Sequence, residues 1–400
     1  MAESATQNPK MGLLASGGAP NLHLIAGALC ALHQQKKSFE VIGASGAGAV
    51  AGLLYAVPKH PGGPVAALEG SIHLNVSDAI YQLLPMNFKA FFKRGPFTNL
   101  FWKLGQSIPH RPLSWDDRNH DTLARLYNDS IDFIAAALTP TTLNYFSKSV
   151  CTRIGVIDDL IDWARLPHYT GEFYLNAFDL RTQRLKAFNK TNLTPETFWA
   201  ALAMPWLFEP TAAQGGLYTE GASHDPSGLE ALWEYADAET EQLDMIIALD
   251  TIGPNLWTNP ENIYDGLQTA IMDPITSLAE TVLTTYVQLE FTANRHNAPK
   301  QVLPRLYWLP FEVPDWEAQH VLEWSYSNAL TLWHVGYDAG KKFSKALDAA
   351  RNDPARLELE KYRYHQAEDN AQRTIDFLDL FKGVLDAKFP PPPNPPRRRK

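Results

Sequence analysis

The sequence predicts an α/β protein whose central sheet is mostly parallel and covered by helices. The first sixty residues alternate strand and helix with short turns between them, a pattern typical of parallel sheets. A further apolar run at Met245–Leu249 has the length and composition of a buried strand. From Gly266 onward, aliphatic and aromatic residues recur at helical spacing, again through 322–337 and 362–380. The opening elements are expected at Met11–Leu14 (strand), His23–Gln34 (helix), Phe39–Ile42 (strand) and Ala47–Tyr55 (helix).

The middle of the sequence indicates an insertion followed by further strands of the sheet. Residues from about 58 to 166 are rich in aromatic, proline and basic residues, so we expect a helical, lid-like insertion over one end of the sheet. Two strands, Glu172–Phe178 and Arg184–Phe188, are expected to form a hairpin through the turn Asp179–Gln183. A helix is expected at Pro195–Ala203.

One main domain is predicted, because no second unit has a clear linker of its own. We expect a mobile N-terminus over residues 1–10 and the domain over 11–345, including the insertion at about 58–166. A helical extension follows over 346–388. The last segment, "FPPPPNPPRRRK" at 389–400, is proline-rich and basic, which favours an extended, solvated tail.

Composition excludes several classes of function. The formal net charge of −9 in 400 residues argues against a nucleic-acid binder, which needs a basic face. The two cysteines, Cys30 and Cys151, are far apart, and no C-x-x-C is present, so neither a disulfide framework nor a zinc site is predicted. The start "MAESATQNPK" lacks the pattern of a signal peptide. We therefore expect a cytoplasmic protein, in contact at most with a membrane surface.

The stretch "VIGASGAGAV" (41–50) places Ser45 on a tight turn between a strand and a helix. A nucleophilic serine suits such a turn, because small flanking residues give room and the helix N-terminus presents amides where an oxyanion forms. Packing or phosphate binding would suit the same turn. Gly17 and Gly18 follow the first strand, and no Walker-type phosphate loop is present in the sequence. These glycines therefore indicate either an oxyanion-binding loop or a tight turn that binds no ligand.

The order of three motifs resembles the patatin-like phospholipase family. They are "LLASGGAPNLHLIAGAL" (13–29), "VIGASGAGAVAGLL" (41–54) and "ALAMPWLFEPTAAQGGLYTEGASHDP" (201–226), within a likeness that extends from Met11 to Phe343. The resemblance implies a three-layer α/β/α fold and a Ser–Asp dyad that hydrolyses acyl esters of lipids. It implies Ser45 as the nucleophile and the amides of Gly17, Gly18 and Gly46 as the oxyanion hole.

The sequence departs from the family pattern at several positions. Ser16 and Pro20 replace a glycine and a basic residue of the oxyanion loop, and Ala47 replaces the last glycine of G-x-S-x-G. Glu220 stands where the family has its catalytic aspartate, and a glutamate can serve as the base when it is suitably positioned. His23 and His224 are weaker candidates for the base, and Asp225 is expected to orient the loop.

The insertion also contains a candidate lipid-contacting segment. Between Met86 and Gln106, aromatic and basic residues interleave, as in segments that enter a lipid headgroup layer. An amphipathic helix packed on the core would show the same pattern. The candidate residues are Phe91, Phe92, Lys93, Arg94 and Trp102.

Together these patterns predict a serine-dependent lipid acyl hydrolase of the phospholipase A, lysophospholipase or esterase type. It acts through an acyl-enzyme and needs neither a metal ion nor an organic cofactor, and its partner is a lipid or acyl-ester substrate. Two alternatives stay open: an inactive lipid- or acyl-binding protein, and a hydrolase of non-lipid esters such as polyesters or thioesters. The sequence leaves the oligomeric state open.

Overall fold

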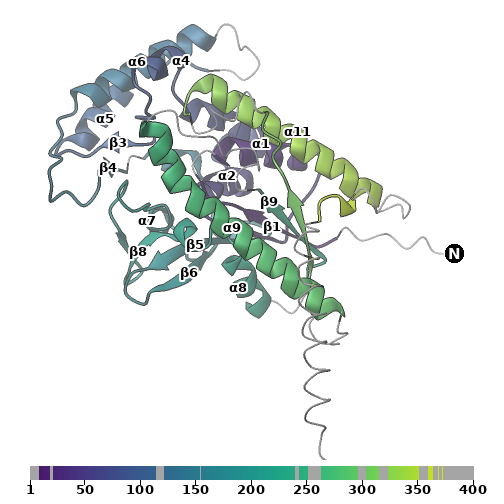
Figure 1. Ribbon diagram of the computed structural model, residues 1–400. Helices are drawn as coiled ribbons and strands as arrows, with labels where there is room; N and C mark the ends of the chain where they lie inside the picture. Colours follow the sequence, from purple (N-terminus) through teal and green to yellow (C-terminus); the bar gives the residue numbers. More distant parts are fainter. Residues whose placement is uncertain are drawn as a thin grey trace, which may run out of the picture.

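The computed structural model describes residues 9–18, 21–113, 121–153, 155–238, 243–250, 263–295, 303–314, 323–350, 359–363, 368 and 372. An eight-stranded sheet has the order β10-β9-β1-β2-β5-β8-β7, with β6 paired to β5. Figure 1 labels several of its strands, among them β9, β1, β5 and β8. Five neighbouring strands are parallel: β10 (Arg305–Leu309), β9 (Met245–Leu249), β1 (Met11–Ala15), β2 (Val41–Ala44) and β5 (Glu172–Asp179). The antiparallel part is formed by β6 (Arg184–Asn189), β7 (Thr211–Ala213) and β8 (Gly216–Glu220).

Helices cover both faces of the sheet because successive side chains of its strands point to opposite sides. Leu13 packs into one core cluster with α1 (Asn21–Gln34), α2 (Gly46–Ala56) and α11 (Tyr326–Ala350). Leu14, the next residue, packs into the other cluster with α8 (Glu230–Ala238) and α9 (Ile263–Arg295). The fold class predicted from the sequence, an α/β protein with a mostly parallel sheet between helical layers, is therefore confirmed.

The insertion has a small core of its own between Val76 and Ala136, while its first and last segments, including Leu68 and Leu166, pack into the main core. Its elements are α3 (Gly63–Gly70), η1 (Ser71–Leu74), α4 (Asp78–Leu83), β3 (Phe92–Lys93), α5 (Thr98–Ser107), α6 (Asp121–Leu138), β4 (Cys151–Thr152), η2 (Asp158–Leu160) and η3 (Leu166–His168). It is thus mainly helical, with one short antiparallel pair, β3 with β4. Two elements complete the list: α7 (Pro195–Ala201) and η4 (Gly221–Ser223).

The described part of the region after Gly266 is mainly helical, as expected, with α9 and α11. The sequence analysis missed three strands: the edge strand β10 within that region, and the pair β7 and β8. The domain boundary expected after 345 falls inside α11, which continues to Ala350, and Leu359 is buried in the main core.

Several expectations fall outside the described residues. They concern residues 1–8, most of 346–388 together with the helix expected at 362–380, and the tail 389–400. Within the described part of the chain, no helix combines the length and the apolar character needed to cross a bilayer.

Candidate active site

Ser45 lies between the end of β2 and the start of α2, where the turn is tightly held. Its amide donates to the carbonyl of Ala15 at 3.1 Å, at the end of the neighbouring strand. Gly48 admits this close approach, because a Cβ there would stand 2.2 Å from the same carbonyl oxygen. Ser45 has ordinary extended dihedrals (φ −139°, ψ 145°), whereas Gly46 has φ +45°. The residue of the turn with left-handed dihedrals is therefore Gly46 and not the serine.

Glu220 ends β8 and places its carboxyl group over the residue that follows Ser45. Its amide donates to Ala203 at 3.0 Å, and its Oε1 lies 2.9 Å from where a Cβ would stand on Gly46. Ser45 Oγ and Glu220 Oε2 are both buried, and neither has a hydrogen-bond partner among the described residues. The structure thus brings the two predicted residues to one place without a hydrogen bond between them.

Burial raises the pKa of Glu220 to about 8, because its charged form loses solvation inside the protein. The carboxyl group is therefore largely protonated at neutral pH in this conformation. A general base whose pKa lies near the operating pH is well suited to proton transfer.

The glycine loop after β1 corrects one predicted oxyanion donor. The Gly17 amide donates to the carbonyl of Pro226 at 2.6 Å, so it is already engaged within the protein. Gly18, with φ +101°, lines the cavity described below. Gly46 is the first residue of α2, where amides have no acceptor within the helix. Of the three predicted donors, Gly18 lies at the cavity and Gly46 at the helix N-terminus.

The other acid–base candidates have structural surroundings of their own. Asp225 is buried and accepts hydrogen bonds from Ser227 Oγ (2.6 Å) and from the amides of Gly228 (3.0 Å) and Glu230 (2.9 Å), so it orients the loop as predicted. His224 is exposed, and its ring stacks on Phe178 at 3.6 Å between centroids. His23 Nε2 contacts Asn75 Nδ2 at 2.5 Å, and burial lowers the pKa of this imidazole to about 4.

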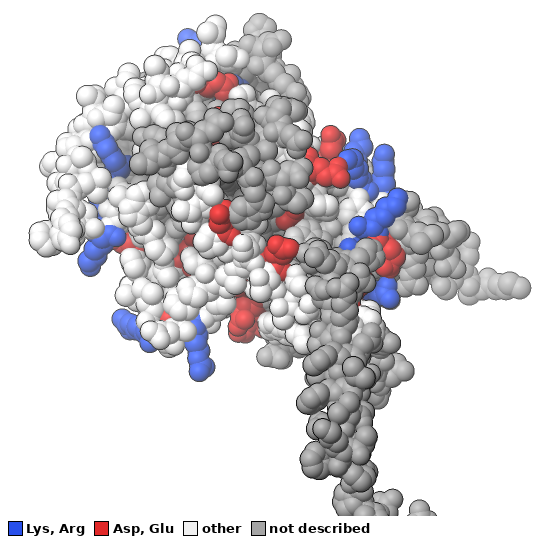
Figure 2. Space-filling view, in the orientation of Figure 1, with Lys and Arg blue, Asp and Glu red and all other residues white. Residues whose placement is uncertain are grey.

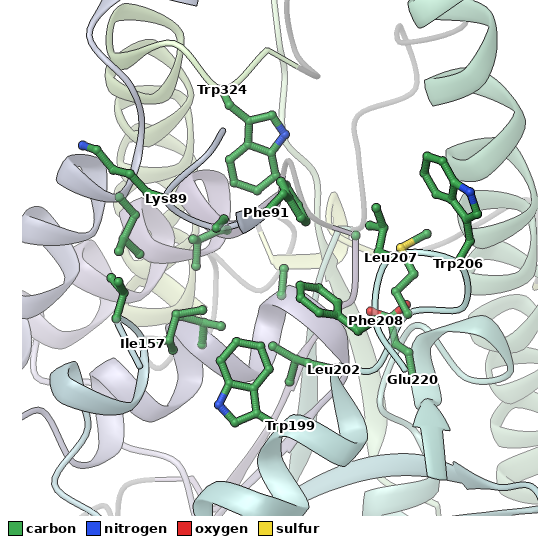
Figure 3. A pocket seen from close by; sticks show the side chains of 18 of the residues that line it. Lys89, Phe91, Ile157, Trp199, Leu202, Trp206, Leu207, Phe208, Glu220 and Trp324 are labelled. Atoms are coloured by element: carbon green, nitrogen blue, oxygen red, sulfur yellow. The ribbon is translucent and has the colours of Figure 1, made fainter. Parts of the chain in front are cut away.

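An apolar cavity of about 260 Å³ opens beside Glu220. In Figure 3 the Glu220 carboxyl group lies at one side, and the rings of Phe91, Trp199 and Trp324 form walls across the cavity. Lys89 contributes its stem while its ammonium points away. The lining is otherwise almost entirely apolar and comes from α1, α2, the insertion, α7 with the loop after it, and α9: Leu22, Ala47, Val50, Leu74, Ala90, Val156, Ile157, Leu202, Met204, Trp206, Leu207, Phe208, Met272 and Ile275.

The predicted lipid-contacting residues lie elsewhere than expected. Phe92 is fully buried in the core of the insertion, with Trp102 packed against it at 5.6 Å between ring centroids. Phe91 lines the cavity. Lys93 Nζ donates to the carbonyl of Ala137 at 3.0 Å, and Arg94 pairs with Glu209. The burial of Phe92 corrects its assignment to a lipid interface, because the ring packs within the protein.

The sequence reasoning missed most of the cavity wall, including Trp199, Leu202 and Phe208. These residues lie in α7 and the loop that follows it, inside the third motif. Trp206 is distinguished by its backbone conformation, which the sequence does not show. Its φ is +73°, which is uncommon for a bulky residue and often marks a functional segment.

The protein thus has an α/β fold with a mixed, mostly parallel sheet. Its candidate active site is an apolar cavity beside the buried residues Ser45 and Glu220. A sequence model of the patatin-like phospholipase family matches residues 13–233, which are 221 of the 400 residues. The chain belongs to the patatin-like phospholipase family, whose activity is hydrolysis of lipid esters.

Two solved structures show a weaker overall likeness. VipD from Legionella pneumophila is similar at 14% identity and a TM-score of 0.37, over 95% of this chain and 77% of that chain. The type III effector protein ExoU is similar at 13% identity and a TM-score of 0.31, over 96% of this chain and 64% of that chain, so this chain covers less than two thirds of ExoU. A comparison with curated proteins gives no match.

Proposed function

We propose that this protein is a serine-dependent lipid acyl hydrolase that cleaves carboxylic esters through an acyl-enzyme. The observation that carries the proposal is the Glu220 carboxyl oxygen, 2.9 Å from the Cβ position of Gly46, beside Ser45 and at the wall of an apolar cavity. An acyl chain suits such a cavity, because its methylene groups gain from leaving water.

In the proposed reaction, Ser45 Oγ attacks the ester carbonyl while its proton passes to ionised Glu220. The carbonyl oxygen becomes an oxyanion, which the amides of Gly18 and Gly46 and the positive end of α2 stabilise. The C–O bond to the alcohol then breaks, and Glu220 returns the proton to the leaving oxygen. Water repeats the sequence on the acyl-enzyme, releasing the fatty acid and restoring Ser45.

The reactive state requires one local change. Ser45 Oγ and Glu220 Oε2 both lack a partner among the described residues, so rotation of the two side chains toward each other would satisfy both buried groups. Catalytic hydrogen bonds commonly tighten only when substrate is bound.

Labelling with a fluorophosphonate, followed by mass mapping of the modified residue, tests the proposal. We expect modification at Ser45 and hydrolysis of a short-chain nitrophenyl ester. Ser45→Ala should abolish both while retaining the fold, because alanine fits a turn of small residues. Ser223→Ala, which changes an exposed serine near Glu220, is the matched control and should keep both. A folded protein that neither reacts nor turns over esters would instead be an acyl-binding protein.

A further inference from the structure

Helix α6 buries four polar side chains and leaves four large apolar ones exposed, while Leu126 and Phe133 pack against the core of the insertion. An ordinary surface helix instead buries its apolar stripe and exposes its polar residues. Leu123 and Leu138 are 71% and 66% exposed, and Tyr127 and Ile134 share their face at spacings of four and seven residues. The buried polar residues of the helix are Arg125, Asn128, Asp129 and Asp132.

Specific contacts fix this orientation. Asp129 accepts the amide of Ser77 at 2.6 Å and pairs with Lys89. Asp132 accepts Gln106 Nε2 at 3.0 Å. Rotating α6 to bury its exposed leucines would break these bonds and leave the buried Ser77 amide and the Lys89 ammonium without Asp129, which is costly. The apolar face is therefore held outward by the polar one.

The apolar face continues onto α5 and the loop after α6. Leu100, Leu104 and Ile108 are exposed at intervals of four residues. Helix α5 lies close to α6, because a Cβ on Gly105 would come 2.9 Å from the Cβ of Ala135. In the described residues, all but four of the exposed large apolar side chains lie between Leu83 and Phe146. Soluble monomers rarely gather so many in one region.

The exposed charges of this region are basic. Across the described residues 83–113 and 122–150, the exposed charged side chains are Lys103, Arg111 and Lys148, while Asp129 and Asp132 are buried. This distribution contrasts with the net charge of −9 for the whole chain. In Figure 2 the left flank, where α5 lies in Figure 1, is mostly white with scattered blue. A surface that is apolar and basic complements an anionic lipid surface.

Trp206 connects this surface to the candidate active site. Its side chain is 56% exposed, lines the cavity beside Glu220, and also bounds a surface hollow with Leu143 and Tyr145. Its carbonyl accepts the amide of Val150 at 3.0 Å, which ties the cavity rim to the insertion. Trp206 thus lies both at the wall of the cavity and beside the exposed loop that contains Leu143 and Tyr145.

We propose that the outer face, defined as Leu100, Leu104, Leu123, Ile134, Leu138 and Tyr145, docks on an anionic lipid bilayer and turns the cavity entrance at Trp206 toward it. The docking rests on the surface alone. Delivery of an ester to Ser45 from that bilayer rests in addition on the proposed function.

Vesicle binding in a Ser45→Ala background tests docking apart from catalysis, because the lipid is not consumed. The vesicles are phosphatidylcholine with and without phosphatidylglycerol. We expect the triple variant Leu100→Gln, Leu104→Gln, Leu138→Gln to lower the partition coefficient at least ~10-fold, since each side chain loses apolar burial in the lipid. The matched control, Leu180→Gln with Leu289→Gln, changes exposed apolar residues outside this region and should bind normally.

Charge is tested separately. Lys103→Glu with Lys148→Glu should weaken binding by at least about fivefold per lysine for anionic vesicles, with little change for neutral ones. Lys341→Glu, an exposed lysine on α11, is the control and should bind like the parent. With Ser45 restored, the triple variant should lose vesicle hydrolysis but keep turnover of a soluble nitrophenyl ester.

Three results would overturn the docking proposal. In the first, the parent protein does not bind anionic vesicles. In the second, the triple variant and its control bind them equally well. In the third, the parent protein binds no vesicles and is a dimer, whereas the triple variant is a monomer. If the parent protein binds anionic vesicles but hydrolyses no ester, the docking proposal stands and the proposed function is contradicted.

Discussion

At the scale of single residues, burial changes the pKa of Glu220, the general base in the proposed function. Since burial raises its pKa to about 8, only the fraction ionised near that pH can accept the Ser45 proton. We therefore expect kcat/KM for a soluble ester to rise with pH through about 8 and then level off. Glu220→Gln should lower the rate by roughly 10²- to 10⁴-fold and remove this inflection. An inflection near the ordinary glutamate value would contradict this assignment.

The same burial links Glu220 to stability. Its pKa is higher in the folded protein, about 8, than the ordinary value of 4.5, so between these values the folded state holds a proton that the unfolded chain has released. Stability should therefore fall as pH rises, with this group contributing up to about 1.4 kcal/mol per pH unit. Urea denaturation across this window should show a smaller decline for Glu220→Gln, which has no proton to lose. An identical decline in both proteins would refute the link.

Gly46 is a residue at which both the backbone dihedrals and the neighbouring atoms favour glycine. Its φ is +45°, and an added Cβ would meet Glu220 Oε1 at 2.9 Å and Ala222 at 3.2 Å. We expect Gly46→Ala to cost on the order of 1–3 kcal/mol of stability and to abolish ester hydrolysis by displacing the carboxyl group. Gly215→Ala is the matched control, since its φ is +77° but its Cβ would meet nothing within 4 Å. It should lose some stability and keep its activity.

At the scale of elements, the edge strand β10 is held by a buried ion pair from two distant segments. Glu290 of α9 accepts the amide of Leu306 at 3.1 Å, and Arg363 donates to the carbonyl of the same residue at 2.8 Å. The two side chains pair at 2.9 Å and are both nearly buried. Together they cover backbone groups that an exposed edge would offer to another chain.

Removing one member of this pair should be costly. Arg363→Met leaves the Glu290 carboxylate buried without its cation, so we expect a loss of about 3–5 kcal/mol in the free energy of unfolding. Adding Glu290→Leu should recover much of that loss, because the uncompensated charge is then gone. Lys342→Met breaks an exposed pair with Glu312 and should cost less than about 1 kcal/mol. Equal losses for Arg363→Met and Lys342→Met in denaturant titrations would contradict this prediction.

At the scale of the whole molecule, the family match is shorter than the folded unit. It ends at residue 233, yet β1 pairs with β9 at residues 245–249, and β9 in turn pairs with β10. A fragment that ends at residue 238 should therefore lack fixed tertiary packing, because it exposes one edge of β1 and the face of α1 that packs on α11. Near-ultraviolet circular dichroism and dye binding measure this. A chain lacking only residues 389–400 is the control and should fold and hydrolyse esters normally. A well-packed 1–238 fragment would show that the matched region is autonomous.

The sequence by itself determined the strand–helix units around Ser45, the hairpin of β5 with β6, and the strand β9. Hydrophobic periodicity and glycine turns act between residues close together in the chain, so their signal is local. The family motifs also indicated Ser45 and Glu220, which the fold brings together from residues 175 positions apart. The missed strand β10 is only five residues long and lies between helices, where a short apolar run does not reveal its partner.

Only the tertiary structure decided which groups are already engaged and which side of an element faces water. The Gly17 amide meets Pro226, Phe92 enters the core of the insertion, and Asp129 of α6 meets Lys89. The sequence of α6 alone fits a helix with its leucines buried as well as one with its leucines exposed. Its orientation depends on partners more than twenty residues away, because a buried charge is stable only where the rest of the fold supplies its counterpart.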